Sequence, residues 1–249
     1  MTGQVAQIWR HPIKSHGRES LEHVDLTENK TMPWDRTWAV AHEMSKADGT
    51  KWEPCANFSI GSKAPALQAI RAKHDPATGT VTLTHPDLPA LTFHPDKDQD
   101  AFLAWVAPIM PTDRAKSARI IRVPDRGMTD TDYPSVSLCN LASNRAIGQR
   151  LGQEISPLRW RGNIMLDGFD AWAEFDWIGR TIQIGTSKLE VKERIVRCNA
   201  TKSNPDTGTR DADTLGALLS GWGHTDFGVY AVVTKSGTIA VGDQAAVLS

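Results

Sequence analysis

The chain has 249 residues, of which 40% are hydrophobic and 23% charged, so we expect an ordinary globular protein with one large domain or two small ones. Its 28 Lys and Arg residues nearly balance 29 Asp and Glu residues, which gives a net charge of −1. This argues against a partner that is attracted by the overall charge of the protein, such as nucleic acid or a membrane surface. The N-terminus carries no long apolar run, so we expect neither a secretion signal nor a membrane span, and we expect the protein in the cytoplasm.

The first half of the chain is predicted to consist mostly of strands. Alternating side chains and turn residues predict strands over residues 3–13, 37–43 and 90–95 and a hairpin over residues 66–86, while apolar residues at helical spacing predict a helix over residues 98–107. Residues 111–134 are polar and contain Pro and Gly, apart from a strand over residues 118–123. We therefore place a boundary near Lys116, between domains 1–115 and 116–249.

The second half repeats this pattern of short strands and few helices. We predict a helix from the N-cap Asn140 to Leu151 and a strand over residues 158–166. A hairpin over 181–198, a helix over 213–222 and a hairpin over 228–248 are predicted to follow. The fold class that follows is mainly β with short helices (α+β), built from closed or nearly closed β-barrels.

Three widely spaced cysteines indicate neither a disulfide framework nor a zinc motif. Cys198 differs from Cys55 and Cys139, which we interpret as structural, because Arg194 and Arg197 precede it and positive charge favours the reactive thiolate. On a strand, Arg194 shares the face of Cys198 and is expected beside its sulfur. The segment NATKSNPDTG that follows is rich in turn residues, whose exposed backbone N–H groups suit an anion.

Three other cationic positions stand out. Lys14 and Ser15 follow the first predicted strand, Arg36 precedes the next, and Arg161 and Asn163 lie inside a later one. Each alone would be read as a solvated surface charge. Together with the cysteine they would suit a large anionic ligand with a phosphate at one end and a soft or metal centre at the other.

These residues carry a resemblance to the MOSC-domain family, the molybdenum-cofactor sulfurase C-terminal family, and to its amidoxime-reducing branch in particular. The most specific match is Cys-x(6)-Pro-Asp-Thr-Gly, from Cys198 to Gly208, and FGVYAVV, GTIAVGD and residues 5–40 add to it. The resemblance implies an N-terminal β-barrel domain over residues 1–115, a MOSC β-barrel domain over residues 116–249, and a bound molybdenum cofactor (Mo-molybdopterin).

The resemblance also implies roles for particular residues. It makes Cys198 the molybdenum ligand and Asp206 a catalytic candidate that orients the loop or relays protons near the metal. Residues implied to contact the cofactor are Lys14, Ser15, Arg36, Arg161, Asn163, Val196, Arg197 and Tyr230. The chain departs from the family where IVRC lacks a second Pro or Cys before the ligand. The segment TDTDYPSVS, residues 129–137, matches poorly and receives no cofactor contact.

The leading hypothesis is an oxidoreductase that reduces small N-hydroxylated or N-oxygenated compounds. Because the sequence has no cysteine cluster for an iron–sulfur centre, electrons are expected from a separate protein, namely a ferredoxin, a flavodoxin or a cytochrome b5-like protein with its reductase. One alternative is a sulfur carrier that holds a persulfide on Cys198 and receives sulfur from a pyridoxal-phosphate desulfurase. Another is a cofactor-binding or storage module without turnover.

Overall fold

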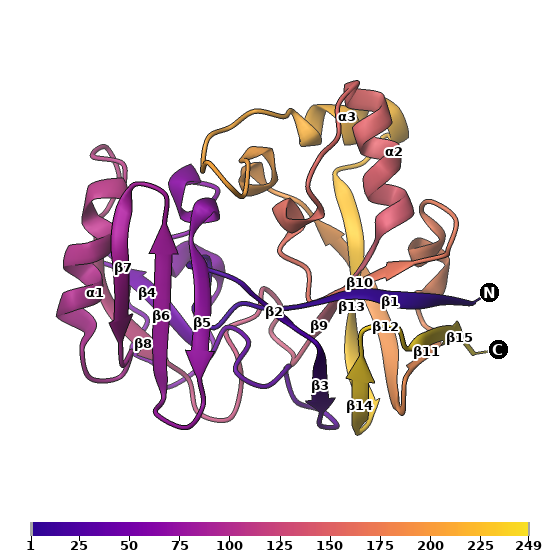
Figure 1. Ribbon diagram of the computed structural model, residues 1–249, viewed down its shortest axis with the longest axis horizontal. Helices are drawn as coiled ribbons and strands as arrows, with labels where there is room; N and C mark the ends of the chain where they lie inside the picture. The colour runs from indigo at the N-terminus through magenta and orange to yellow at the C-terminus, as the bar shows by residue number, and fades with distance from the viewer. Residues whose placement is uncertain (1, 249) are drawn as a thin grey trace.

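The computed structural model describes residues 2–248 and shows two lobes side by side (Figure 1). The strands are β1 (Thr2–Arg10), β2 (Glu19–Leu21), β3 (His23–Leu26), β4 (Trp38–His42), β5 (Arg71–Asp75), β6 (Thr80–His85), β7 (Leu88–Phe93), β8 (Ser117–Arg122), β9 (Val136–Asn140), β10 (Ile164–Asp167), β11 (Thr181–Ile184), β12 (Ser187–Val196), β13 (Asp226–Lys235), β14 (Gly237–Ala240) and β15 (Gln244–Val247). The helices are α1 (Gln99–Val106), α2 (Leu141–Leu151) and α3 (Thr214–Trp222), with 3₁₀ turns η1 (Cys55–Asn57), η2 (Pro65–Ala69), η3 (Ala107–Ile109), η4 (Pro157–Trp160), η5 (Ala173–Trp177) and η6 (Asn199–Lys202).

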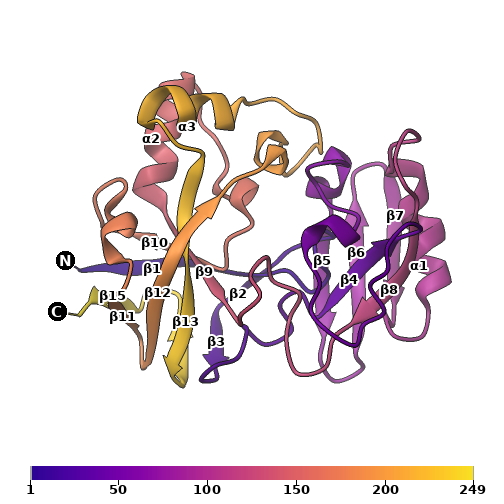
Figure 2. The same cartoon turned by 180° about the vertical axis from the view of Figure 1, so that it is seen from behind.

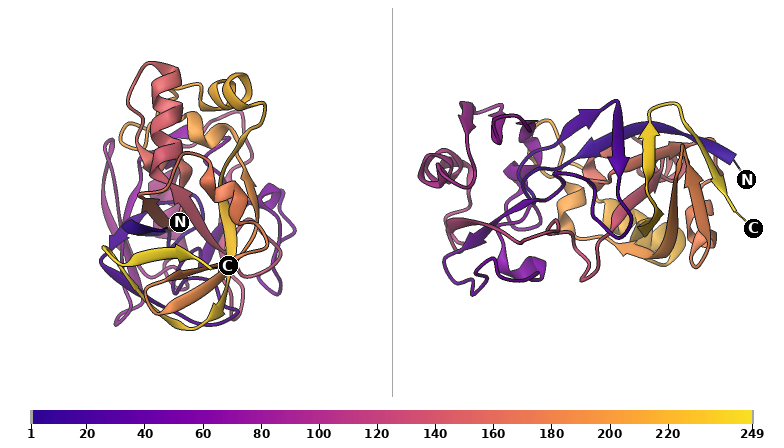
Figure 3. Two further views of the ribbon diagram at one scale, coloured as in Figure 1. Left: turned by 90° about the vertical axis from the view of Figure 1, so that its right-hand side faces the viewer. Right: turned by 90° about the horizontal axis from the view of Figure 1, so that it is seen from below.

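The C-terminal lobe is a closed barrel of seven strands. Its hydrogen-bonded order is β10-β9-β13-β12-β11-β15-β1, and β1 pairs back onto β10. Both chain ends lie at one end of this barrel (Figure 3), because the first and last strands are neighbours in it. Alternate residues point inward along each strand and fill the barrel with aliphatic side chains such as Val5, Ile164 and Val229. The predicted mainly β fold with short helices is confirmed.

The N-terminal lobe packs two small sheets and α1 around its own core. Strands β5, β6 and β7 form one antiparallel sheet, and β4 pairs with β8 in the other. Along β6, Val81 and Leu83 alternate with exposed or half-buried threonines and meet Trp38 and Phe102 in the core. The helix and the strand near residue 118 lie where the sequence pattern predicts them, and Figure 2 shows this lobe from behind. The predicted hairpin also forms, but its first strand begins at Arg71, because Pro65–Ala69 form the turn η2.

The predicted strand over residues 158–166 is wrong in its first half. Residues Pro157–Trp160 form η4, and the strand begins only at Ile164. Proline at the first helical position and the Ser156 side chain, which accepts a hydrogen bond from the Leu158 N–H at 3.3 Å, favour a helical turn there. Arg161 ends the turn in a left-handed conformation.

The predicted hairpin over residues 228–248 is also wrong. Strand β13 does not pair with β14 after residues 235–237; instead β14 pairs with β3 near the start of the chain. Strand β15 inserts between β1 and β11, where it gains two hydrogen-bonded neighbours. The barrel closes through this long-range pairing, which a local turn signal does not reveal.

The two lobes share strands across the predicted domain boundary. Strand β8 lies after Lys116 in the sequence and pairs with the N-terminal lobe, whereas β1 and β3 lie before it and pair with the C-terminal lobe. The boundary at Lys116 stays a prediction. No helix within residues 2–248 has the length and apolar character needed to cross a membrane.

Candidate functional site

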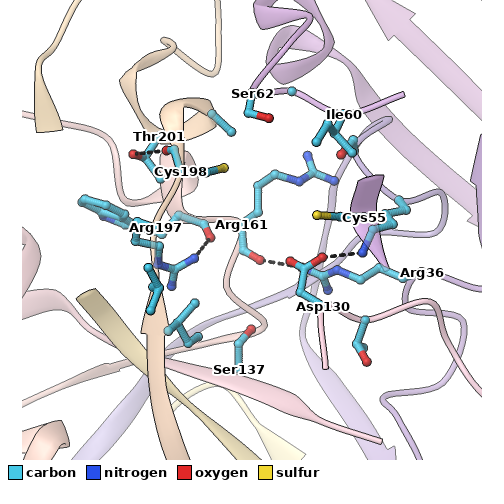
Figure 4. A pocket seen from close by; sticks show the side chains of 18 of the residues that line it. Arg36, Cys55, Ile60, Ser62, Asp130, Ser137, Arg161, Arg197, Cys198 and Thr201 are labelled. Atoms are coloured by element: carbon cyan, nitrogen blue, oxygen red, sulfur yellow. Dashed lines mark hydrogen bonds and ion pairs between the residues drawn. The ribbon is translucent and has the colours of Figure 1, made fainter. Parts of the chain in front are cut away.

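A pocket lies between the lobes and is lined from both (Figure 4). We call it the interlobe pocket. Every site residue implied by the family resemblance lines it except Asp206; these are Lys14, Ser15, Arg36, Arg161, Asn163, Val196, Arg197, Cys198 and Tyr230. The structure thus gathers residues from five separate segments of the chain into one cavity.

Cys198 follows the end of β12 and caps η6. Its carbonyl oxygen accepts hydrogen bonds from the N–H of Thr201 at 3.2 Å and from the Thr201 hydroxyl at 3.0 Å, which fix the backbone. Its side chain is exposed and points into the interlobe pocket (Figure 4). The thiol is therefore held on a defined backbone and remains accessible to a ligand.

The prediction that Arg194 lies beside this sulfur is wrong. The register of β12 shifts between Arg194 and Val196, and the Arg194 guanidinium stacks on Phe175 at 4.2 Å, outside the pocket. Arg197 occupies the pocket instead. Strand β12 ends at Val196, so the alternation of side chains along a strand does not extend to Cys198 and does not place Arg194 beside its sulfur.

Two guanidinium groups of the pocket have no carboxylate partner within residues 2–248. Arg197 donates from Nε to the Phe227 carbonyl at 2.8 Å and from Nη1 to the Trp160 carbonyl at 2.7 Å. Arg161 donates from Nη2 to the Gly17 carbonyl at 3.0 Å, and its buried Nη1 has no partner in this part of the chain. Burial, with the charges of Arg36 and Arg18, lowers the pKa of Arg161 to about 9. An unsatisfied buried cation of this kind favours an anionic ligand.

The remaining cations of the pocket are paired. The Lys14 ammonium binds Asp130 and donates to the Met128 carbonyl at 2.8 Å, and Arg36 binds Asp35. Burial acts to raise the pKa of Asp130, but Lys14 and Arg36 outweigh it and lower that pKa to about 2. Lining cations are Lys14, Arg36, Arg159, Arg161 and Arg197, and the carboxylates paired with them are Asp35, Asp130 and Asp211. The pocket is left with an excess of positive charge.

Three of the lining residues adopt left-handed backbone conformations. Ser15 has φ = 63°, Arg36 has φ = 52° and Arg161 has φ = 49°. Such conformations cost a non-glycine residue about 1–2 kcal/mol. They persist where the surrounding structure holds them, and they cluster at functional sites.

Asn163 lines the pocket, but the protein itself uses its amide. Its Oδ1 accepts hydrogen bonds from the Ser137 N–H at 3.1 Å and the Ser137 hydroxyl at 2.8 Å, and its Nδ2 donates to the Trp9 carbonyl at 3.2 Å. Asn163 therefore joins β1, β9 and the turn that carries Arg161. Tyr230 lies opposite on β13, and burial, aided by Asp130, raises the pKa of its phenol.

Sequence reasoning missed several lining residues. Cys55, interpreted as structural, is exposed on η1 and faces the pocket, whereas Cys139 is buried in the core as expected. The segment 129–137, which received no cofactor contact, supplies Thr129, Asp130, Ser135 and Ser137. A short polar segment of Thr, Ser and Asp around Pro134 was the available signal. Arg159, Ile60, Gly61, Ser62, Trp160, Ile195, Ala200 and Thr201 complete the lining.

Asp206 lies away from the interlobe pocket. Its side chain is 62% exposed and pairs with Arg71 at 3.1 Å and with Arg18 at 3.6 Å, both in the N-terminal lobe. Buried Arg18 also donates to the Pro205 carbonyl at 2.7 Å. The Pro-Asp-Thr-Gly turn thus docks the loop that follows Cys198 onto the other lobe, and a proton relay through Asp206 stays a prediction.

The donor set of the pocket restricts what it can hold. Within residues 2–248 no group of three or more His, Cys, Asp or Glu side chains could bind a metal ion. A metal at Cys198 would therefore need most of its ligands from an organic cofactor. A soft thiolate beside an anion-binding set of arginines fits a molybdenum ion carried by a phosphate-bearing pterin dithiolene.

Comparisons with known proteins match both lobes. The family model of the MOSC N-terminal beta barrel domain matches residues 2–115, and that of the MOSC domain matches residues 126–246. Mitochondrial amidoxime-reducing component 1 of Mus musculus is 25% identical over 97% of this chain and 81% of its own length. The Homo sapiens protein of that name is 23% identical over 97% and 82%. Among solved structures, the YuaD protein of Bacillus subtilis aligns with a TM-score of 0.47 at 12% identity, covering 98% of this chain and 94% of that one.

Proposed function

Because the chain belongs to the MOSC family, with a MOSC N-terminal β-barrel domain ahead of its MOSC domain, we propose that it binds the molybdenum cofactor in the interlobe pocket and reduces small N-hydroxylated or N-oxygenated compounds. Two relatives similar over nearly the whole chain are named as amidoxime-reducing components, which supports the reaction class. The observation that carries the proposal is the exposed thiol of Cys198 in one cavity with Arg161, whose buried Nη1 has no partner within residues 2–248.

Different residues of the interlobe pocket would hold the phosphate and the metal of the cofactor. Arg161, Lys14 and Ser15 would hold the phosphate through charge-assisted hydrogen bonds, and the Cys198 thiolate would ligate the metal. The bound cofactor supplies two-electron redox chemistry, with the balance R–NHOH + 2 e⁻ + 2 H⁺ → R–NH₂ + H₂O. Because its pKa is raised, Tyr230 keeps the proton on Oη at neutral pH and can donate a hydrogen bond into the pocket.

Electrons for this reaction would come from a separate donor protein, because the three cysteines within residues 2–248 are not clustered as an iron–sulfur centre requires. A ferredoxin, a flavodoxin or a cytochrome b5-like protein with its reductase would serve. We also propose that the enzyme works in the cytoplasm, where free thiols such as those of Cys55 and Cys198 stay reduced.

Metal content tests the proposed function directly. We would purify the protein from a host that makes molybdenum cofactor and count molybdenum per chain by mass spectrometry. We expect near-stoichiometric metal that is lost in Cys198→Ser, with the fold retained by circular dichroism, whereas Cys55→Ser keeps the metal. Full molybdenum content and full turnover in Cys198→Ser would refute the assignment.

The sulfur-carrier alternative has one structural observation in its favour. Cys55 places a second thiol in the same pocket as Cys198, where it could receive or release sulfur by exchange with a persulfide. Protein without molybdenum that carries a trapped persulfide on Cys198 would support this alternative. Bound pterin with no persulfide would exclude it.

A further inference from the structure

Cys198 borders a second hollow on the molecular surface, outside the interlobe pocket. We call it the outer hollow. Cys198 belongs to the lining of both cavities, so a molecule in the outer hollow lies next to the proposed metal ligand. The part of its lining that bears on ligand binding is Lys63, Pro65, Asp113, Arg114, Arg210 and Leu215.

The outer hollow carries an excess of positive charge that its own carboxylate does not balance. Lys63 and Arg210 form no ion pair within residues 2–248, and Arg210 donates from Nη2 only to the Ser62 carbonyl, at 2.8 Å. Arg114 has one weak partner, with Nε at 3.7 Å from the Asp113 carboxylate. With one carboxylate against three cations, the hollow keeps a net charge of about +2.

The fold brings these cations together, since they come from three distant segments of the chain. Lys63 and Arg114 belong to the N-terminal lobe, and Arg210 follows the Pro-Asp-Thr-Gly turn of the C-terminal lobe. Pro65 and Leu215 add apolar surface that suits the hydrocarbon part of a small molecule. The cations that we assign to the cofactor line the interlobe pocket, so the cations of the outer hollow remain free to bind another ligand.

We propose that the outer hollow receives the substrate and selects N-oxygenated compounds that carry a carboxylate or a phosphate group. This inference rests on the proposed function and adds a substrate class to it. Exposed charge pairs contribute little in water, so each cation gives a preference of a few-fold that weakens as salt screens it.

The test compares benzamidoxime, which is neutral, with 4-carboxybenzamidoxime, using the molybdenum-loaded enzyme and a small chemical reductant. We expect a higher kcat/KM for the carboxylate at low salt. The double variant Lys63→Gln, Arg210→Gln should lower kcat/KM for the carboxylate about tenfold and leave the neutral compound within about twofold. Raising the salt to about 0.5 M should remove most of the difference.

Lys235→Gln, an exposed lysine at the far end of β13, is the matched control and should change neither value. A second measurement is the Kd of 4-carboxybenzamidoxime for the enzyme without reductant, which should weaken in the double variant in the same proportion. Equal kcat/KM for both compounds would overturn this inference and leave the proposed function standing.

Two further results would also decide whether the outer hollow binds the substrate. No turnover of either compound, in enzyme shown to contain molybdenum, would overturn the proposed function and this inference together. If the double variant slows both compounds only when a protein supplies the electrons, the outer hollow docks the donor protein and does not select the substrate.

Discussion

Arg161 is the residue whose environment points most directly to a ligand. Its Nη1 is buried without a partner within residues 2–248, and its pKa is lowered by burial and by neighbouring arginines. The backbone at this position is left-handed, with φ = 49°. Such an arrangement adds nothing to stability, and it supports the proposal that Arg161 binds an anionic ligand.

Replacing Arg161 by Gln should therefore separate stability from binding. We expect the free energy of unfolding of the cofactor-free protein to stay equal or to rise by up to about 2 kcal/mol, because an uncompensated buried charge is removed. Cofactor binding should weaken about ten- to a hundredfold, as loss of charge-assisted hydrogen bonds predicts. Denaturant unfolding and pterin content measure the two effects.

Exposed Arg122 provides the control for that substitution. Arg122→Gln should alter neither unfolding nor pterin content, since its side chain is half-exposed and pairs weakly with Asp96 at 3.4 Å. A marked loss of stability in Arg161→Gln would show that the arginine is structural.

His16 should make stability depend on pH. It is fully buried, and its Nδ1 lies 2.7 Å from the Lys14 carbonyl; burial lowers its pKa to about 4 from the ordinary value of 6.5. In the unfolded chain His16 therefore binds a proton below about pH 6.5, whereas in the folded chain it does not bind one until the pH falls to about 4. The stability this histidine contributes is complete above pH 6.5 and is lost as the pH falls through that window.

The expected size is about 1.4 kcal/mol per pH unit, or about 2 kcal/mol between pH 6.5 and pH 5. We would measure urea unfolding at pH 7.5 and pH 5 for the native protein and for His16→Gln, whose loss of stability on acidification should be smaller by that amount. Exposed His23→Gln should show the native pH dependence. An unchanged slope in His16→Gln would contradict the prediction.

At the scale of elements, the loop between Cys198 and α3 owes its position to the other lobe. Gln68 donates to the Ala200 carbonyl at 3.0 Å, and the Gly208 backbone passes close to Ala66. Gly208 has φ = 70°, and a Cβ atom there would lie 2.7 Å from the Ala66 Cα. Glycine is therefore required at position 208 for two reasons: the left-handed backbone conformation disfavours a side chain, and there is no space for a Cβ atom beside Ala66.

Gly208→Ala should lower stability more than the same change at Gly179, which has φ = 79° and open space around it. Both substitutions cost about 1 kcal/mol for the left-handed backbone, and the contact with Ala66 adds about 1–3 kcal/mol at Gly208 alone. Thermal or urea unfolding measures the difference. Equal losses for the two variants would mean that the loop moves away from the N-terminal lobe at little cost.

At the scale of the whole molecule, the interlobe pocket exists because the lobes are tied together. Strands β1 and β3 carry the start of the chain into the C-terminal lobe, and buried Arg18 forms hydrogen bonds to both lobes. Its guanidinium donates to the carbonyls of Gln68 at 2.6 Å and Pro205 at 2.7 Å. Each lobe supplies part of the pocket, so the site depends on how they are joined.

Arg18→Met should loosen that junction. Removing the guanidinium leaves the carbonyls of Gln68, Ile70 and Pro205 without this donor, so we expect a loss of about 2–4 kcal/mol in the free energy of unfolding. The loop after Cys198 should also become more sensitive to limited proteolysis. Arg71→Met, which removes an exposed partner of Asp206, should cost less than about 1 kcal/mol and leave the loop protected. Similar proteolysis of both variants would argue against a role for Arg18 in docking the lobes.

Much of the secondary structure and of the site could be predicted from the sequence. The helix from Asn140 to Gly152 is one example: the Asn140 side chain accepts from the Ala142 N–H at 3.0 Å, and Gly152 is left-handed. These are local effects of a few neighbouring residues, which is why the sequence alone predicts them. The spacing from Cys198 to Gly208 identified the family for the same reason.

What only the tertiary structure decided depends on contacts between distant segments. Strand β12 ends before Cys198, so Arg194 stacks on Phe175 outside the pocket while Arg197 lines it, and the packing of the lobes brought Cys55 to face Cys198. Asp206, which lies within the most recognisable motif, is held by the other lobe and stays outside the pocket. Sequence spacing fixes neighbours along the chain, whereas burial, charge balance and access to a cavity arise only when the two lobes meet.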